Sequence, residues 1–71
     1  MTSNSVKLRQ ELEDVVQART GRRVLNLAFD VLPERIVLRG RTSSYHVKQL
    51  AQHGVRDVLP DVRLENAIVV G

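Results

Sequence analysis

Arginine residues recur at alternate positions along one short stretch of the chain, a pattern that could bind an anionic partner. Arg35, Arg39 and Arg41 share one parity, and Val37 lies among them. Alternate residues of a β-strand point to the same side, so one face of this strand would carry three guanidinium groups. Guanidinium groups pair with carboxylates and phosphates. We therefore take Arg35, Arg39 and Arg41, together with Arg23, as candidate residues for binding an anionic partner.

Two other interpretations of these arginines stay open. The arginine-bearing face could be an ordinary solvated one, with its guanidinium groups paired to Glu65 and Asp30. Arg23 follows the expected end of a helix, where a cation interacts favourably with the helix dipole.

If the arginines bind a membrane, the binding should be weak. Near an anionic membrane each basic residue contributes on the order of 1 kcal/mol, so three or four of them predict weak, salt-sensitive binding.

No other residues are spaced for catalysis or metal binding. His46 and His53 are seven residues apart on an expected helix, which separates them by about 10 Å and is too far for one shared metal ion. The chain has no cysteine, so a thiolate site is excluded. Ser43 and Ser44 are better explained as helix caps than as nucleophiles. We expect no catalytic residue, no metal ligand and no cofactor.

Length and composition indicate one small domain over residues 1–71, with residues 1–5 disordered. The chain is 42% hydrophobic and 27% charged, which is typical of a globular domain. One Phe, one Tyr and no Trp leave little aromatic surface for stacking on bases. The glycines lie at 21, 40, 54 and 71, so the Gly-x-x-Gly loop of a KH-like nucleic-acid binder is absent. Nucleic acid is therefore the least expected partner.

The sequence also predicts the cellular compartment of the protein. The first residues lack a basic segment followed by an apolar run, so we see no signal peptide. The apolar runs are far shorter than the roughly 18 to 20 residues that cross a bilayer, so no transmembrane segment is expected. As written, the chain is expected to be cytoplasmic. It would be periplasmic or membrane-associated if it were part of a longer exported protein.

The first half of the chain predicts a helix and a hairpin. A helix should begin near Ser5 and end at Thr20-Gly21, where glycine can take the left-handed conformation of a C-terminal cap. From Arg23 the apolar period changes to two, which predicts a strand. Its inward residues should be Leu25, Leu27, Phe29 and Val31, and its outward residues Val24, Asn26, Ala28 and Asp30. A turn around Pro33 should then lead into an antiparallel strand from Ile36 to Gly40.

The second half predicts a helix and a last strand. Ser43 or Ser44 should cap a helix that ends before Pro60. Gly54 lies on its apolar face, which favours close packing on the sheet. Residues 64–70 alternate as a strand in which Asn66 points inward, so its amide must find hydrogen-bond partners at a neighbouring turn or helix end.

These elements predict an α+β fold in the order α-β-β-α-β. Each has one strongly apolar side, so we expect a two-layer sandwich with a three-stranded sheet and both helices on one face. The last strand should be parallel to the second if its crossover is right-handed. Whether it lies beside the second strand or across the first stays open. The uncovered face would carry the arginines with Val24, Asn26, Ala28, Ala67 and Val69.

The order and spacing of these motifs resemble the BON domain of bacteria. The resemblance rests on Ile36-x-Leu38-x-Gly40, a serine-rich helix start, Ala51, and a closing Leu64-x-Asn66-x-Ile68-x-Val70, and it runs from Leu8 to Val70. The chain departs from the family at two turns, with Pro33-Glu34 in the hairpin and Asp61 before the last strand. The resemblance implies a non-enzymatic bacterial module, usually in exported or membrane-associated proteins and proposed to bind phospholipid surfaces.

We therefore expect a binding module for anionic phospholipid surfaces or a scaffold for a protein partner. The main alternative is a structural domain that forms a homo-oligomer through the open sheet face or an edge strand, because unpaired strand edges invite another chain. A KH-like nucleic-acid binder is a weaker alternative.

Overall fold

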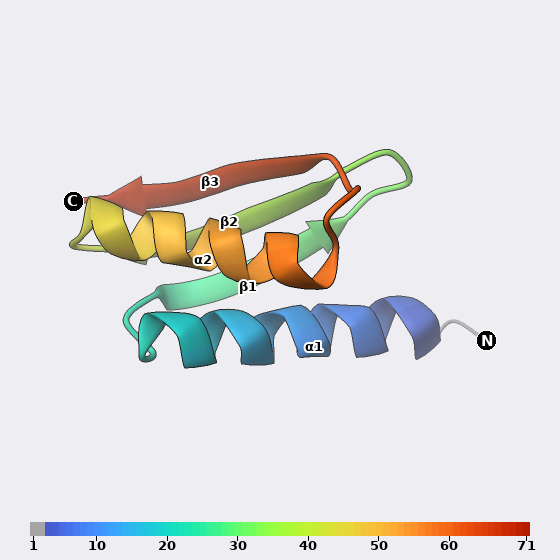
Figure 1. Ribbon diagram of the computed structural model, residues 1–71, viewed down its shortest axis with the longest axis horizontal. Coiled ribbons are helices and arrows are strands. Elements are labelled where there is room, and N and C mark those ends of the chain that lie inside the picture. The colour runs from blue at the N-terminus through green and yellow to red at the C-terminus, as the bar shows by residue number, and fades with distance from the viewer. Residues whose placement is uncertain (1–2) are drawn as a thin grey trace.

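The computed structural model describes the backbone of residues 3–71 and the side chains from residue 7 onward. Five elements follow one another: α1 (Ser3–Thr20), β1 (Leu25–Val31), β2 (Ile36–Thr42), α2 (Tyr45–Val58) and β3 (Leu64–Val70) (Figure 1). The expected α+β fold and its element order are confirmed.

The start of α1 differs from the expected one. The helix begins at Ser3, two residues before the expected start near Ser5, so residues 3–5 are helical where we expected disorder. Adding a residue to a helix that is already nucleated forms one more hydrogen bond at small cost, which explains the longer helix. Residues 1 and 2, to which the same expectation applied, lie outside the described residues.

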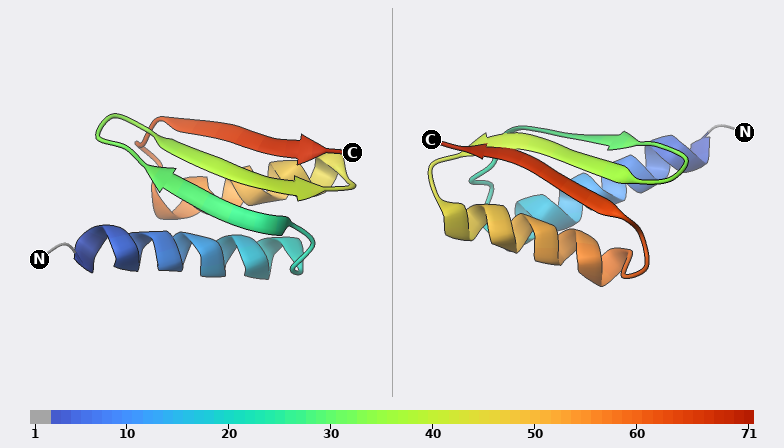
Figure 2. Two further views of the ribbon diagram at one scale, coloured as in Figure 1. Left: turned by 180° about the vertical axis from the view of Figure 1, so that it is seen from behind. Right: turned by 90° about the horizontal axis from the view of Figure 1, so that it is seen from above.

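The three strands form one sheet in the order β1-β2-β3. β1 is antiparallel to β2 and β3 is parallel to β2, so the last strand lies beside the second one and the open question of strand order is resolved. Both helices lie on the same side of the sheet, with α1 next to β1 and α2 beneath β2 and β3 (Figure 2). Within residues 3–71 the opposite face carries no helix, so its side chains are available for other contacts.

The core lies between the helices and the sheet. It consists of Leu12, Val16, Val24, Phe29, Ile36, Leu38, Val47, Ala51, Val55 and Ile68. Full burial of a Val, Leu, Ile or Phe side chain contributes about 1.5 to 3 kcal/mol, so this mainly aliphatic cluster is the main source of stability.

The helix ends follow the expected capping chemistry. Gly21 has a φ of +64°, and the Arg22 N–H donates to the Gln17 carbonyl at 2.9 Å, which is the hydrogen bond of a left-handed C-terminal cap. Ser44 caps α2, its Oγ accepting from the Val47 N–H at 3.4 Å. Both predicted caps are confirmed.

A β-bulge in β1 changes the predicted strand pattern. Leu25 pairs with Arg41 and Ala28 pairs with Arg39, so β1 has one more residue than β2 between these two pairs. Asn26 takes up the irregularity with a φ of +55°, which asparagine tolerates better than most residues. As a result Leu25 lies on the uncovered face and Val24 is buried in the core. The predictions that Leu25 points inward and Val24 outward were wrong.

Two glycines allow close packing. A Cβ on Gly40 would lie 2.6 Å from Val24 Cγ1 and 3.2 Å from the Leu25 carbonyl oxygen, so only glycine leaves room for the bulge of β1. A Cβ on Gly54 would lie 3.2 Å from Arg19 Cγ. Gly54 therefore lets α2 approach α1, and the prediction that it packs closely on the sheet was wrong about the partner.

Candidate binding surface on the open face of the sheet

The uncovered face of the sheet has three rows of side chains, which the strand register fixes. The first row is Asp30, Val37 and Glu65, the second is Ala28, Arg39 and Ala67, and the third is Leu25, Arg41 and Val69. We refer to Arg35, Arg39, Asp30, Val37 and Glu65 as the closed half of this face, and to Leu25, Arg41 and Val69 as the open row.

Ion pairs cover the closed half. Arg39 Nε lies 2.8 Å from Asp30 Oδ2, and Arg35 Nε lies 3.5 Å from Glu65 Oε1. Val37 points to the same face from the central strand, between Asp30 and Glu65, yet only 5% of its surface is exposed. The paired side chains on both sides account for this burial. The alternative interpretation, in which the arginines are paired with carboxylates, therefore holds for Arg39 with Asp30 and for Arg35 with Glu65.

The open row has a different character. Leu25 is 62% exposed and Val69 is 56% exposed, and Arg41 lies between them on β2. Within the described side chains, Arg41 forms no ion pair. An unpaired guanidinium group between two exposed aliphatic side chains can contact an anion and apolar groups of the same partner.

Leu25 is the residue of this row that sequence reasoning missed. Strict alternation along β1 placed it in the core, but the bulge turns it to the uncovered face. The signal in the sequence was Asn26, since asparagine is one of the few non-glycine residues that adopt a positive φ readily.

Arg23 lies apart from the other candidate arginines. It is in the connection between α1 and β1, and its Nε is 3.7 Å from the place that a Cβ on Gly21 would occupy. The charged group therefore lies beside the C-terminal end of α1, where the helix dipole favours a cation. The structure brings Arg35, Arg39 and Arg41 to one strand face and leaves Arg23 at the end of the helix.

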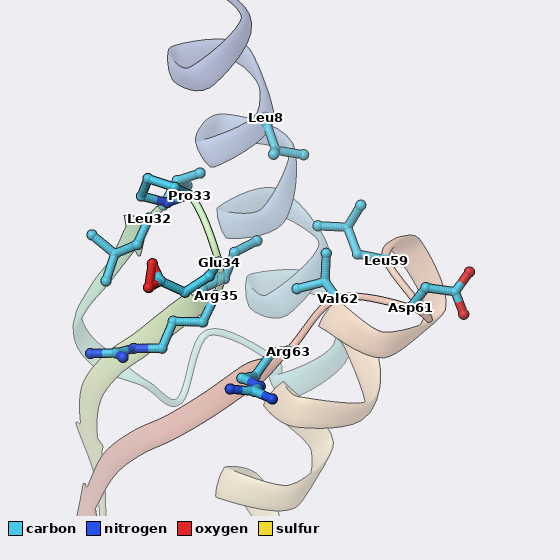
Figure 3. A pocket seen from close by; sticks show the side chains of 11 residues that line it. Leu8, Leu32, Pro33, Glu34, Arg35, Leu59, Asp61, Val62 and Arg63 are labelled. Carbon is cyan, nitrogen blue, oxygen red and sulfur yellow. The ribbon is translucent and has the colours of Figure 1, made fainter.

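A hollow of about 320 Å³ opens at the other end of the molecule, between the β1–β2 turn and the α2–β3 connection. Figure 3 shows Leu8, Leu59 and Val62 around its apolar side, with the Asp61 carboxylate turned away. Its charged lining residues are Glu34, Arg35, Asp61 and Arg63. Two cations against two anions give this hollow no preference for an anionic partner. Sequence reasoning did not identify this hollow, because the turn and the connection that form it have no regular secondary structure and so no periodic pattern.

The remaining polar residues that the sequence singled out, His46, His53 and Asn66, form no binding site within the residues that the structure describes. His46 and His53 are exposed on α2, and no group of three or more His, Cys, Asp or Glu side chains is placed to hold a metal ion between residues 7 and 71. Asn66 Nδ2 donates to the Lys48 carbonyl at 3.1 Å and to Gln52 Oε1 at 3.2 Å. As expected, Asn66 is hydrogen-bonded, but its partners lie in the middle of α2 rather than at a helix end.

Comparisons with known proteins found no match for this chain among family models, curated proteins or solved structures. Its resemblance to the BON domain therefore stays a prediction from the residues quoted above. Neither α1 nor α2, as described from residue 3 onward, is long and apolar enough to cross a membrane.

Proposed function

We propose that this chain is a non-enzymatic, BON-like binding module that contacts anionic phospholipid surfaces through the open row. The observation that carries the proposal is the position of Arg41, which lies between exposed Leu25 and Val69 and has no ion-pair partner within the described side chains. An anionic bilayer surface offers phosphate groups to the guanidinium group and an acyl boundary to the aliphatic side chains.

The expected binding is weak. One basic residue near an anionic surface contributes about 1 kcal/mol. Leu25 and Val69 could add about 1.5 to 3 kcal/mol each if their side chains were fully buried, and less with partial insertion. Arg35 and Arg39 should add little, because Glu65 and Asp30 offset their charges. Affinity should therefore depend on Arg41 more than on Arg35 or Arg39, and should fall as salt is added.

Self-association or a protein partner is the second candidate, because two exposed aliphatic side chains in one row also suit a protein interface. If two copies stacked their open rows about a two-fold axis, the two Arg41 side chains would come close together. Their like charges would repel each other, and an interface of that kind would need an anion between them. This repulsion favours an anionic partner over a second copy on this face.

Vesicle sedimentation tests the proposal. The wild-type chain should pellet with vesicles that contain phosphatidylglycerol at low salt, and should not pellet with phosphatidylcholine vesicles or at high salt. Arg41→Glu should abolish pelleting. The matched control is Arg9→Glu, which makes the same charge change at an exposed position of α1 and should keep most of the binding.

Two results would count against the proposal. The first is no pelleting of the wild type with anionic vesicles at low salt. The second is an equal loss in Arg41→Glu and Arg9→Glu, which would mean that only net charge matters. Sedimentation equilibrium without vesicles should show a monomer, and a dimer that Arg41→Glu strengthens would favour self-association through the open row.

A further inference from the structure

β3 is an edge strand with a regular set of backbone groups on its free side. The Arg63 carbonyl accepts from the Ile36 N–H at 2.9 Å, and the Gly71 N–H donates to the Thr42 carbonyl at 3.0 Å. Residues 63 and 71 therefore face β2, and so do the odd-numbered residues between them. Backbone groups of alternate residues point to opposite sides of a strand. The N–H and C=O groups of residues 64, 66, 68 and 70 thus face the free edge, where another strand could add.

One donor on this edge is already occupied. The Ile68 N–H donates to Oδ1 of the Asn66 side chain at 3.2 Å. The other end of the same amide is held by α2, since Nδ2 donates to the Lys48 carbonyl and to Gln52 Oε1. The amide is thereby fixed in place by three hydrogen bonds. A strand that added to this edge would need the Ile68 N–H and would have to displace the Asn66 side chain.

We propose that the Asn66 amide, held by α2, closes the β3 edge, and that without it this edge pairs antiparallel with β3 of a second copy of the chain. The partner follows from the strand itself. An antiparallel pair centred on Ala67 sets the edge-facing residues in two symmetric pairs, Leu64 opposite Val70 and Asn66 opposite Ile68. Such an interface is two-fold symmetric, with the same residues contributed by each copy.

Charges on the uncovered face support the second copy as partner. In this register Glu65 lies opposite Val69 of the second copy. Val69 is the neighbour of Arg41 in the open row, so Glu65 of one copy and Arg41 of the other lie two strands apart, about 10 Å, on the same face. Their long side chains can reach across Val69. The pairing would let Glu65, which is ion-paired with Arg35 of its own copy, also approach Arg41 of the other copy, and Arg41 has no ion-pair partner among the described side chains.

Hydrogen exchange tests the closed edge in the wild-type chain. The Ile68 amide should exchange roughly tenfold more slowly than the Asn66 backbone amide, which faces the same edge, because among the described side chains only the former finds a hydrogen-bond acceptor. Equal exchange of the two amides would overturn the proposal. This measurement requires no substitution and so does not depend on a variant that folds.

Asn66→Val tests the pairing, because valine suits a strand and cannot accept a hydrogen bond. The wild type should sediment as a monomer at high micromolar concentration, and Asn66→Val as a concentration-dependent dimer. Adding Glu65→Lys should return the variant to a monomer, because Lys would face Arg41 of the other copy. Adding Arg41→Glu as well should restore the dimer. A folded Asn66→Val variant that stays monomeric, or a dimer indifferent to both charge changes, would overturn the proposal.

Discussion

The two parts of the uncovered sheet face differ although they lie on the same three strands. In the closed half, Arg35 and Arg39 pair with Glu65 and Asp30, and Val37 between them is almost completely buried. In the open row, Leu25 and Val69 are more than half exposed and Arg41 has no ion-pair partner among the described side chains. Arginines at the same strand parity thus have different surroundings, and the neighbouring strands determine which one is available to a partner.

The residues that β1 and β3 place beside each arginine cause this difference, and the extra residue in β1 adds Leu25 to the open row. Where β1 is regular, it places Asp30 beside Val37 and supplies a carboxylate to the closed half. Beyond the bulge at Asn26, it places Leu25 beside Arg41 and supplies no carboxylate. The bulge requires glycine at position 40, because Val24 occupies the space that a larger side chain would need.

Filling the space at Gly40 should have the largest effect on this arrangement. Gly40→Ala should lower the free energy of unfolding by about 3 kcal/mol, because its Cβ would collide with Val24 Cγ1 and approach the Leu25 carbonyl. In a Val24→Ala background the same substitution should cost about half as much. Urea denaturation measures both values. Equal costs in the two backgrounds would show that Val24 does not set the limit at Gly40.

The next largest effect on stability compares the closed half with the open row directly. Val37→Ser should lower the free energy of unfolding by about 2 kcal/mol, because Val37 is buried under the ion pairs. The matched change Leu25→Ser should alter it by no more than about 0.5 kcal/mol, because Leu25 is mostly exposed. Thermal or urea unfolding of both variants tests the contrast. Similar losses would mean that the open row is covered in solution.

A smaller effect is expected at the bulge. Asn26→Val should cost about 1 kcal/mol, because a β-branched residue is strained at a φ of +55°. Asn26→Gly should be nearly neutral, since glycine adopts a positive φ readily. Urea unfolding of the two variants measures the difference. If valine and glycine behave alike, the backbone at residue 26 is not left-handed in solution.

Sequence periodicity predicted the fold because each helix and strand has a clear apolar side. The strand pattern failed where β1 departs from regular geometry, because Val24 and Leu25 are both aliphatic and alternation alone does not tell which one is buried. Asn26 and Gly40 are the residues that allow the bulge. Their role can be recognised only once the strand register shows that they lie near each other.

The candidate site was predictable in part for a similar reason. Strand parity correctly grouped Arg35, Arg39 and Arg41 on one face, and the carboxylates Glu65 and Asp30 were named as alternative partners. Which arginine stays unpaired depends on the neighbours of each one across the sheet, and a single chain read along its length does not give the strand order. The hollow near Leu59 depends on two irregular connections, whose path periodicity does not describe.

The smallest stability effect concerns the ion pairs, and it separates stability from binding. A double-mutant cycle with Asp30→Asn and Arg39→Gln should give a coupling of about 0.5 kcal/mol that fades in 1 M salt, because the pair is exposed. Asp30→Asn alone should nevertheless increase sedimentation with anionic vesicles, because it frees Arg39, whereas the control Asp14→Asn, which makes the same charge change at an exposed site on α1, should increase it less. If the two variants bind equally, pairing within the closed half does not decide which arginines are available.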